Sequence, residues 1–106
     1  MAVKIRYLFS ERSDRWEVKI IGEVDINTST EVKEKLESIL EEKQKSMIIN
    51  AEELDYIDST GLGMLIGIVK KLKQQDLELV LAKPQDSILK LFRITGLDKV
   101  IRIREE

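Results

Sequence analysis

The stretch of sequence that most constrains the fold runs from residue 47 to residue 72. A short apolar run, residues 47–49, leads through an acidic connection to the sequence Asp-Ser-Thr-Gly-Leu-Gly at residues 58–63, and an amphipathic segment follows. This order predicts a buried strand, a turn and a helix whose first residues supply N-cap oxygens and flexible backbone. The free N–H groups and the partial positive charge at such a helix start favour an anion.

Two alternating patterns near the N-terminus predict a β-hairpin. In residues 3–9 and 16–20 apolar side chains recur at every second position, which is typical of half-buried strands, and polar residues 10–14 lie between the two runs. After the hairpin, Thr28 and Glu31 fit a capping box, so a helix is expected to begin near Thr28.

The second half of the chain alternates between predicted strands and helices. The apolar run 77–82 predicts a strand ended by Lys83-Pro84, and residues 88–92 predict a helix closed by Gly96 as C-cap. Residues 100–103 predict a last short strand. The order predicts an α/β fold with one domain over residues 1–106, built from a mixed, mostly parallel sheet of roughly four to five strands with amphipathic helices.

A helical wheel divides the central helix into two faces. The predicted core face carries Leu62, Leu65, Ile66, Val69 and Leu72, whereas Thr60, Met64, Gly67 and Lys71 lie on the opposite face. An exposed methionine beside a small residue suits an adaptable protein contact surface. It is equally consistent with one surface apolar residue of no special function.

Composition excludes several classes of function. The chain has no cysteine and no histidine, which removes disulfides, thiolate catalysis and the commonest general base and metal ligand. A net charge of -2 gives no global attraction to nucleic acid or anionic lipid. No apolar run approaches the roughly 20 residues of a membrane span, and the N-terminus lacks a signal-peptide core. We expect a cytoplasmic protein that binds neither nucleic acid nor membrane and carries no cofactor or metal.

Three motifs together resemble the anti-sigma factor antagonists, the bacterial branch of the STAS domains. The first is residues 57–63, Ile-Asp-Ser-Thr-Gly-Leu-Gly, which is similar to the family signature Asp-Ser-Ser/Thr-Gly-Leu-Gly. The second is residues 22–25, Gly-Glu-Val-Asp. The third is the segment near the C-terminus that runs from Leu91-Phe92 to Gly96-Leu97. Thr60 replaces the commoner second serine and Val24 replaces a leucine, and the Thr60 hydroxyl could compete as a phosphate acceptor.

The resemblance implies a phosphorylation switch. Ser59 matches the serine that the cognate anti-sigma factor, a serine kinase, phosphorylates. The unphosphorylated form is expected to bind the kinase and release a sigma factor, phosphorylation to abolish binding, and a PP2C-type phosphatase to reset the switch. Asp58 is expected to orient the Ser59 hydroxyl or meet basic residues of the kinase. The expected partner-binding residues are Asp25, Asp58, Thr60, Gly61, Gly63 and Met64.

Several alternatives remain open on sequence alone. The Asp-Ser-Thr-Gly segment could be a plain helix cap. A receiver-like phosphoaspartate domain would use Lys83-Pro84 and Asp55 or Asp58, although the acidic pair after the first strand is missing. An enzyme is disfavoured, because Gly61-Leu62-Gly63 lacks the Gly-Lys-Ser/Thr ending of a P-loop. Within the resembled family, the chain could instead work in a stress-signalling or other regulatory assembly that controls no sigma factor.

Overall fold

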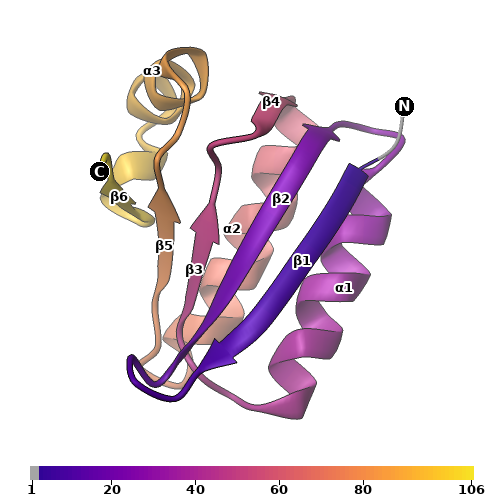
Figure 1. The fold of residues 1–106 in the computed structure, drawn as a ribbon. Helices are drawn as coiled ribbons and strands as arrows, with labels where there is room; N and C mark the ends of the chain where they lie inside the picture. The colour runs from indigo at the N-terminus through magenta and orange to yellow at the C-terminus, as the bar shows by residue number, and fades with distance from the viewer. Residues whose placement is uncertain (1–2) are drawn as a thin grey trace.

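The computed structural model describes residues 3–106, which form one sheet with helices on one of its faces. The elements in chain order are β1 (Val3–Ser10), β2 (Arg15–Val24), α1 (Ser29–Glu42), β3 (Met47–Asn50), β4 (Leu54–Ile57), α2 (Ser59–Lys73), β5 (Leu79–Ala82), α3 (Asp86–Thr95), the 3-10 helix η1 (Leu97–Lys99) and β6 (Arg102–Arg104). Figure 1 shows α1 and α2 side by side behind the sheet, with α3 beyond the end of β5.

The sheet confirms the predicted α/β fold with a mixed, mainly parallel core. Its six strands run in the order β1-β2-β3-β5-β6, and β4 pairs with β2 beside this path. Among the strand pairs of residues 3–106, only the β1–β2 hairpin is antiparallel, whereas β2–β3, β2–β4, β3–β5 and β5–β6 are parallel. The hairpin and the three α-helices of residues 3–106 differ from five successive βα units, so the receiver alternative is wrong.

The sequence pattern did not predict the strand β4. It occupies part of the acidic connection, and its two middle residues, Asp55 and Tyr56, are exposed while Leu54 and Ile57 are buried. Four residues with this pattern are too few for periodicity to identify a strand. The pairing of β4 with β2 depends on Gly22, where the register of β2 shifts and φ is 112°, a value that L side chains rarely adopt.

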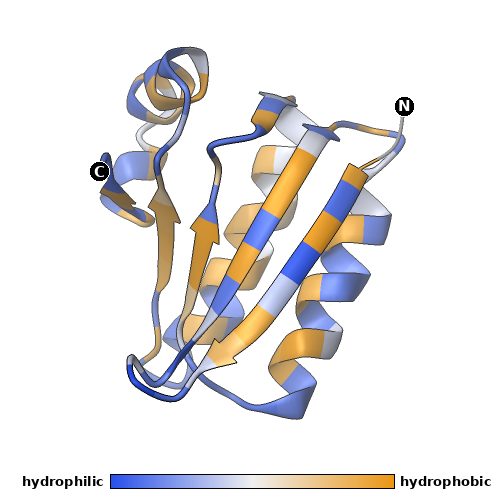
Figure 2. Cartoon of the chain, in the orientation of Figure 1, coloured by the Kyte–Doolittle hydropathy of each residue, from blue (hydrophilic) through white to orange (hydrophobic). Residues whose placement is uncertain are grey.

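The hydrophobic core lies between the sheet and the helix layer. Figure 2 shows apolar residues along β3 and β5, as expected for central strands with parallel neighbours on both sides. Alternate residues of β2, β3 and β5 point to the helices and are almost fully buried, for example Val18, Ile49 and Leu81. The helix α3 closes one end of this core with Phe92, and Gly96 caps it with φ 77°, as predicted.

The central helix is rotated relative to the face that the wheel predicted. Met64 is 8% exposed and Ile68 is 1% exposed, whereas Ile66, which was placed in the core, is only half-buried. The predicted surface position of Met64 is therefore wrong. The reason is that this side of α2 faces α1.

Polar contacts at the rim confirm that α1 and α2 meet along this side. Lys71 Nζ of α2 lies 2.8 Å from Glu37 Oε2 of α1, and just beyond the ends of the two helices Gln75 Nε2 donates to Gln44 Oε1 at 2.7 Å. The hydrogen bond from Lys71 lowers the pKa of the Glu37 carboxyl. A helical wheel uses the sequence of one helix and contains no information about a second helix packed beside it. The wheel therefore assigned this partly apolar side of α2 to the surface.

The start of α2 packs so closely on β2 and β4 that only glycine fits at position 61. A Cβ atom on Gly61 would lie 2.7 Å from Ile57 Cγ1, 2.8 Å from Val24 Cγ1 and 3.0 Å from the Val24 carbonyl oxygen. A Cβ atom on Gly63, two residues later, would meet no heavy atom within 4 Å outside the backbone of its own helix and its chain neighbours. The two glycines of the motif therefore differ in their structural role.

Alanine substitutions should separate these two roles. We expect Gly61→Ala to lower the free energy of unfolding by about 1–3 kcal/mol, because the methyl group overpacks the contact with Val24 and Ile57. Gly63→Ala should raise it by about 0.5–1 kcal/mol, because the site is open and alanine favours a helix. Urea unfolding of both variants checks this, and equal changes of the same sign would contradict the packing described here.

Candidate functional site

The candidate site lies where the carboxyl ends of β2 and β4 meet the starts of α1 and α2, at the upper edge of the sheet in Figure 1. Since β2 and β4 are parallel neighbours, the segment after Val24 and the segment after Ile57 leave the sheet side by side. The carboxyl edge of parallel strands is where open α/β sheets commonly place their sites. The loops that carry Asp25 and Asp58 therefore share one edge of the sheet.

The carboxylate of Asp58 holds the two segments together. Its Oδ1 accepts a hydrogen bond from the Gly61 backbone N–H at 3.0 Å, which caps α2, and its Oδ2 accepts one from the Ile26 N–H at 3.1 Å. The Asp58 N–H itself donates to the Val24 carbonyl at 3.1 Å. Both carboxylate oxygens thus bind backbone groups, and within residues 3–106 no hydrogen bond joins Asp58 to the Ser59 hydroxyl.

The carboxylate of Asp25 organises the neighbouring turn. Its Oδ1 accepts from the Asn27 N–H at 2.8 Å and from the Thr28 N–H at 3.1 Å. The Thr28 hydroxyl donates to the Glu23 carbonyl at 2.8 Å and accepts from the Asp25 N–H at 3.0 Å. Thr28 is the N-cap residue of α1, but its side chain does not cap the helix, so the predicted capping box is wrong. The hydroxyl turns back to fix the turn instead.

The exposed part of the predicted motif is Ser59, Thr60 and Gly63. All three lie in the first turns of α2 and reach solvent. Ser59 is the first helical residue and is exposed to solvent. Gly61 and Met64, which were predicted to contact a partner, are both buried. Gly61 packs on the sheet and Met64 joins the core beside α1, which corrects both assignments.

Two exposed apolar side chains that the sequence pattern did not predict lie next to this motif. Ile26 is 72% exposed, and its N–H is the group that Asp58 binds, so its position is fixed relative to the start of α2. Tyr56, from the strand that leads into Asp58, is 50% exposed. An isoleucine inside the polar segment 25–28 is the only signal that could have indicated this surface.

The described residues contain neither a candidate metal site nor a candidate membrane-spanning helix. In the part of the chain that the structure describes, no group of three or more acidic side chains could hold a metal ion. Among residues 3–106, no helix is both long and apolar enough to cross a membrane. The site presents the exposed hydroxyls of Ser59 and Thr60 at a helix start. The neighbouring carboxylates of Asp25 and Asp58 accept hydrogen bonds from backbone N–H groups.

Comparison with known proteins gives the family. The family model of the STAS domain matches residues 10–106. An anti-sigma-B factor antagonist from Staphylococcus aureus (strain NCTC 8325 / PS 47) is 39% identical over 90 residues, which cover 85% of this chain and 83% of that protein.

Two solved structures share the fold. The Thermotoga maritima protein TM1081 has a TM-score of 0.88 at 18% identity, covering 96% of this chain and 86% of that chain. The Bacillus cell fate determinant SpoIIAA in its phosphorylated form has a TM-score of 0.70 at 21% identity, covering 99% of this chain and 93% of that chain. Together with the family match and the relative at 39% identity, the motif at the start of α2 leads to one conclusion: the chain belongs to the STAS domain family, among the anti-sigma factor antagonists.

Proposed function

We propose that this chain is a partner-switching protein controlled at Ser59. The unphosphorylated chain binds an anti-sigma factor that is a serine kinase, and a sigma factor is released. Phosphorylation of Ser59 ends the binding, and a PP2C-type phosphatase restores it. The observation that carries the proposal is the exposure of Ser59 as the first residue of α2, on a backbone that Asp58 fixes. SpoIIAA, a protein of the same fold, has been solved in a phosphorylated form, which supports control of this chain by phosphorylation.

The fold can accept a phosphate at Ser59 without rearranging. The modification adds a charge of about -1.5 to -2 at pH 7. Partial positive charge at a helix start stabilises an anion by about 0.3–1 kcal/mol at an exposed position. The Asp58 carboxylate opposes the new charge, but it is held by the Gly61 and Ile26 N–H groups and has a fixed place in the structure. Phosphorylation therefore changes the binding of a second protein at this surface rather than the structure of the domain.

The docking surface that we propose combines the Ser59 region of α2 with the Ile26 turn. Ser59, Thr60 and Gly63 supply a flat helix surface, since Gly63 projects no side chain and leaves open space above it. Ile26 supplies an exposed apolar side chain of the kind that contributes binding energy when a partner buries it. Asp25 and Asp58 contribute mainly by holding these groups in place.

A phosphate in the middle of this surface would oppose docking. It adds bulk and negative charge beside Asp25 and Asp58, and like charges at an interface cost on the order of several kcal/mol. About 1.4 kcal/mol is a tenfold change in affinity, so this cost is enough to turn a tight complex into a weak one. A single covalent change thus selects between bound and free states.

Phosphorylation of Ser59 can be tested directly. After incubation of the chain with the cognate anti-sigma factor kinase and ATP, mass spectrometry should locate one phosphate on Ser59. Ser59→Ala should abolish it, whereas a Thr60→Ala chain should still carry its phosphate on Ser59, which tests whether the adjacent hydroxyl is the acceptor. Ser59→Asp should weaken binding to the kinase at least tenfold. A Ser59→Ala chain that is still phosphorylated at the full rate would refute the assignment.

The contribution of Ile26 can be tested separately from phosphorylation. Ile26→Ser should weaken binding of the unphosphorylated chain to the kinase by about tenfold or more, because it removes an apolar contact of about 1.5–3 kcal/mol. Ile94→Ser is the control, since Ile94 is 83% exposed on α3, away from the motif. Calorimetric titration measures both. Equal weakening by the two substitutions would show that the interface is not centred on the Ile26 turn.

A further inference from the structure

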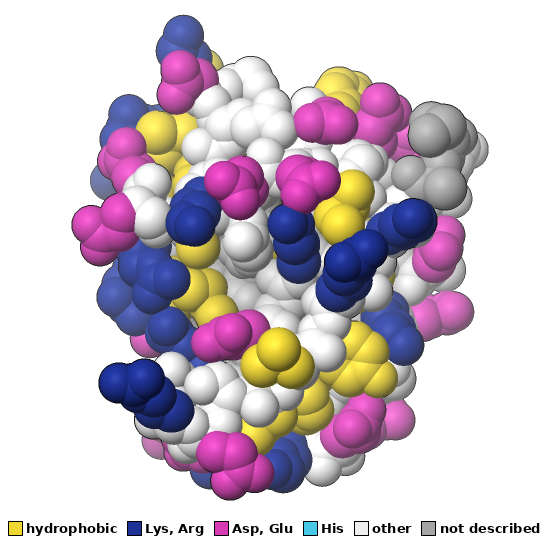
Figure 3. Space-filling model, in the orientation of Figure 1, with side chains coloured by type: hydrophobic (Ala, Val, Ile, Leu, Met, Phe, Trp, Pro, Cys, Tyr) yellow, Lys and Arg dark blue, Asp and Glu magenta, His cyan; other side chains and the backbone are white. Residues whose placement is uncertain are grey.

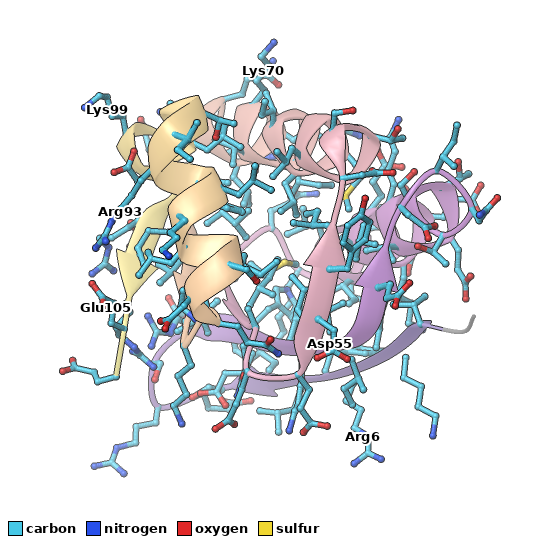
Figure 4. All side chains as sticks on the ribbon, turned by 90° about the horizontal axis from the view of Figure 1, so that it is seen from above. Arg6, Asp55, Lys70, Arg93, Lys99 and Glu105 are labelled. Carbon is cyan, nitrogen blue, oxygen red and sulfur yellow. The ribbon has the colours of Figure 1, made fainter. Side chains whose placement is uncertain are left out.

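The face of the sheet opposite α1 and α2 carries a second candidate site. Figure 4 shows Arg6 pointing away from the sheet on this side, while Lys70 points out from the helix layer on the other side. The strand register places five residues in one row across this open face, from β1 to β6: Arg6, Lys19, Asn50, Ala82 and Arg104. Long cationic side chains therefore stand at both ends of the row, and short side chains occupy its middle.

This arrangement produces a hollow over the centre of the sheet. Its volume is about 330 Å³, and its lining includes Asn50, Ala82 and the apolar side chain of Ile48. In the space-filling view, lysine and arginine side chains stand on both sides of the hollow (Figure 3). Ile48, Val80 and Ala82 form a small buried apolar cluster of their own on this side, separate from the main core. The floor thus combines the amide of Asn50 with the apolar side chains of Ile48 and Ala82, and the walls are mainly basic.

The charge of the hollow is opposite to that of the whole chain. The cations in its lining are Arg6, Arg15, Lys19, Lys83 and Arg104, and the one acid in the lining is Glu17. Lys19 is paired with Glu53 at 2.6 Å, but the other four cations have no ion pair with any of the described residues 3–106. In a chain of net charge -2, such a concentration of unpaired positive charge favours an anion.

Two of these arginines also have unsatisfied hydrogen-bond donors. The Nε atoms of Arg15 and Arg104 are buried and have no hydrogen-bond partner among the described residues. A buried guanidinium N–H without an acceptor is unfavourable, and such groups are rare in folded proteins unless another molecule supplies the acceptor. The charge of the lining and these free donors are independent observations that point to the same kind of ligand.

We propose that this hollow binds a small phosphomonoester with an apolar body. The planar guanidinium group of arginine forms paired hydrogen bonds with the oxygens of a phosphate. A dianionic phosphate offers more acceptor oxygens than a single carboxylate does. The apolar floor at Ile48 and Ala82 would cover the organic part, and the volume lies at the lower end of the range for small-molecule sites. The site faces away from the helix layer and is independent of phosphorylation at Ser59.

Phenyl phosphate is a suitable probe, titrated into the full chain labelled with ¹⁵N. We expect saturable shifts of the backbone amide signals, concentrated at Asn50, Ala82 and Arg104. Arg104→Gln and Arg6→Gln, at opposite ends of the row, should each weaken binding at least fivefold. Lys90→Gln, on an exposed position of α3, is the matched control for loss of one positive charge and should leave the affinity unchanged. Circular dichroism checks that each variant is folded. The affinity of each arginine variant is measured separately, so that one variant still tests the proposal if the other does not fold.

Three results would overturn the proposal. The first is the absence of saturable shifts at the named amides. The second is equal weakening by Lys90→Gln and the arginine variants, which would show attraction to net charge alone. The third is that inorganic phosphate, or an acidic peptide of equal charge, binds as tightly as phenyl phosphate. In that case the apolar floor would contribute nothing, and the ligand class would be wrong.

Discussion

The structure of the functional edge depends on the carboxylate of Asp58. One of its oxygens caps α2 through the Gly61 N–H, and the other binds the Ile26 N–H in the turn between β2 and α1. A hydrogen bond to a charged acceptor contributes about 1.5–3 kcal/mol, more than one between neutral groups. Because the two donors are far apart in sequence, this side chain sets where Ser59 and Ile26 lie relative to each other.

A fixed frame with a changeable surface suits a protein that switches partners. Asp58, Asp25 and Thr28 bind backbone groups, and Gly61 brings the helix into contact with β2 and β4, so the frame has little freedom to adapt. Ser59, Thr60, Gly63 and Ile26 stand outside this frame and reach solvent. We therefore interpret the proposed switch as a change of surface charge on a rigid support, which needs no second conformation of the domain.

The sequence pattern predicted the parts of the fold that depend on local chemistry. The hairpin, the apolar central strands, the helix start at Asp58 and the Gly96 cap follow from period, capping and backbone preference. Packing between elements could not be predicted from the local sequence. Met64 and Gly61 were expected at the surface, because no local pattern indicates that α1 lies beside Met64 and that β2 lies beneath Gly61. The basic hollow was also invisible, because its residues come from separate strands and meet only through the register of the sheet.

Hydrogen exchange at the Ile26 and Gly61 amides, measured before and after phosphorylation of Ser59, tests the rigid frame most directly. Both amides donate to Asp58, so their protection reports whether that carboxylate stays in place when a second negative charge arrives next to it. The account predicts that both amides remain protected to a similar extent in the two forms. Loss of protection at either amide in the phosphorylated chain would contradict it, since the frame would then rearrange with the switch.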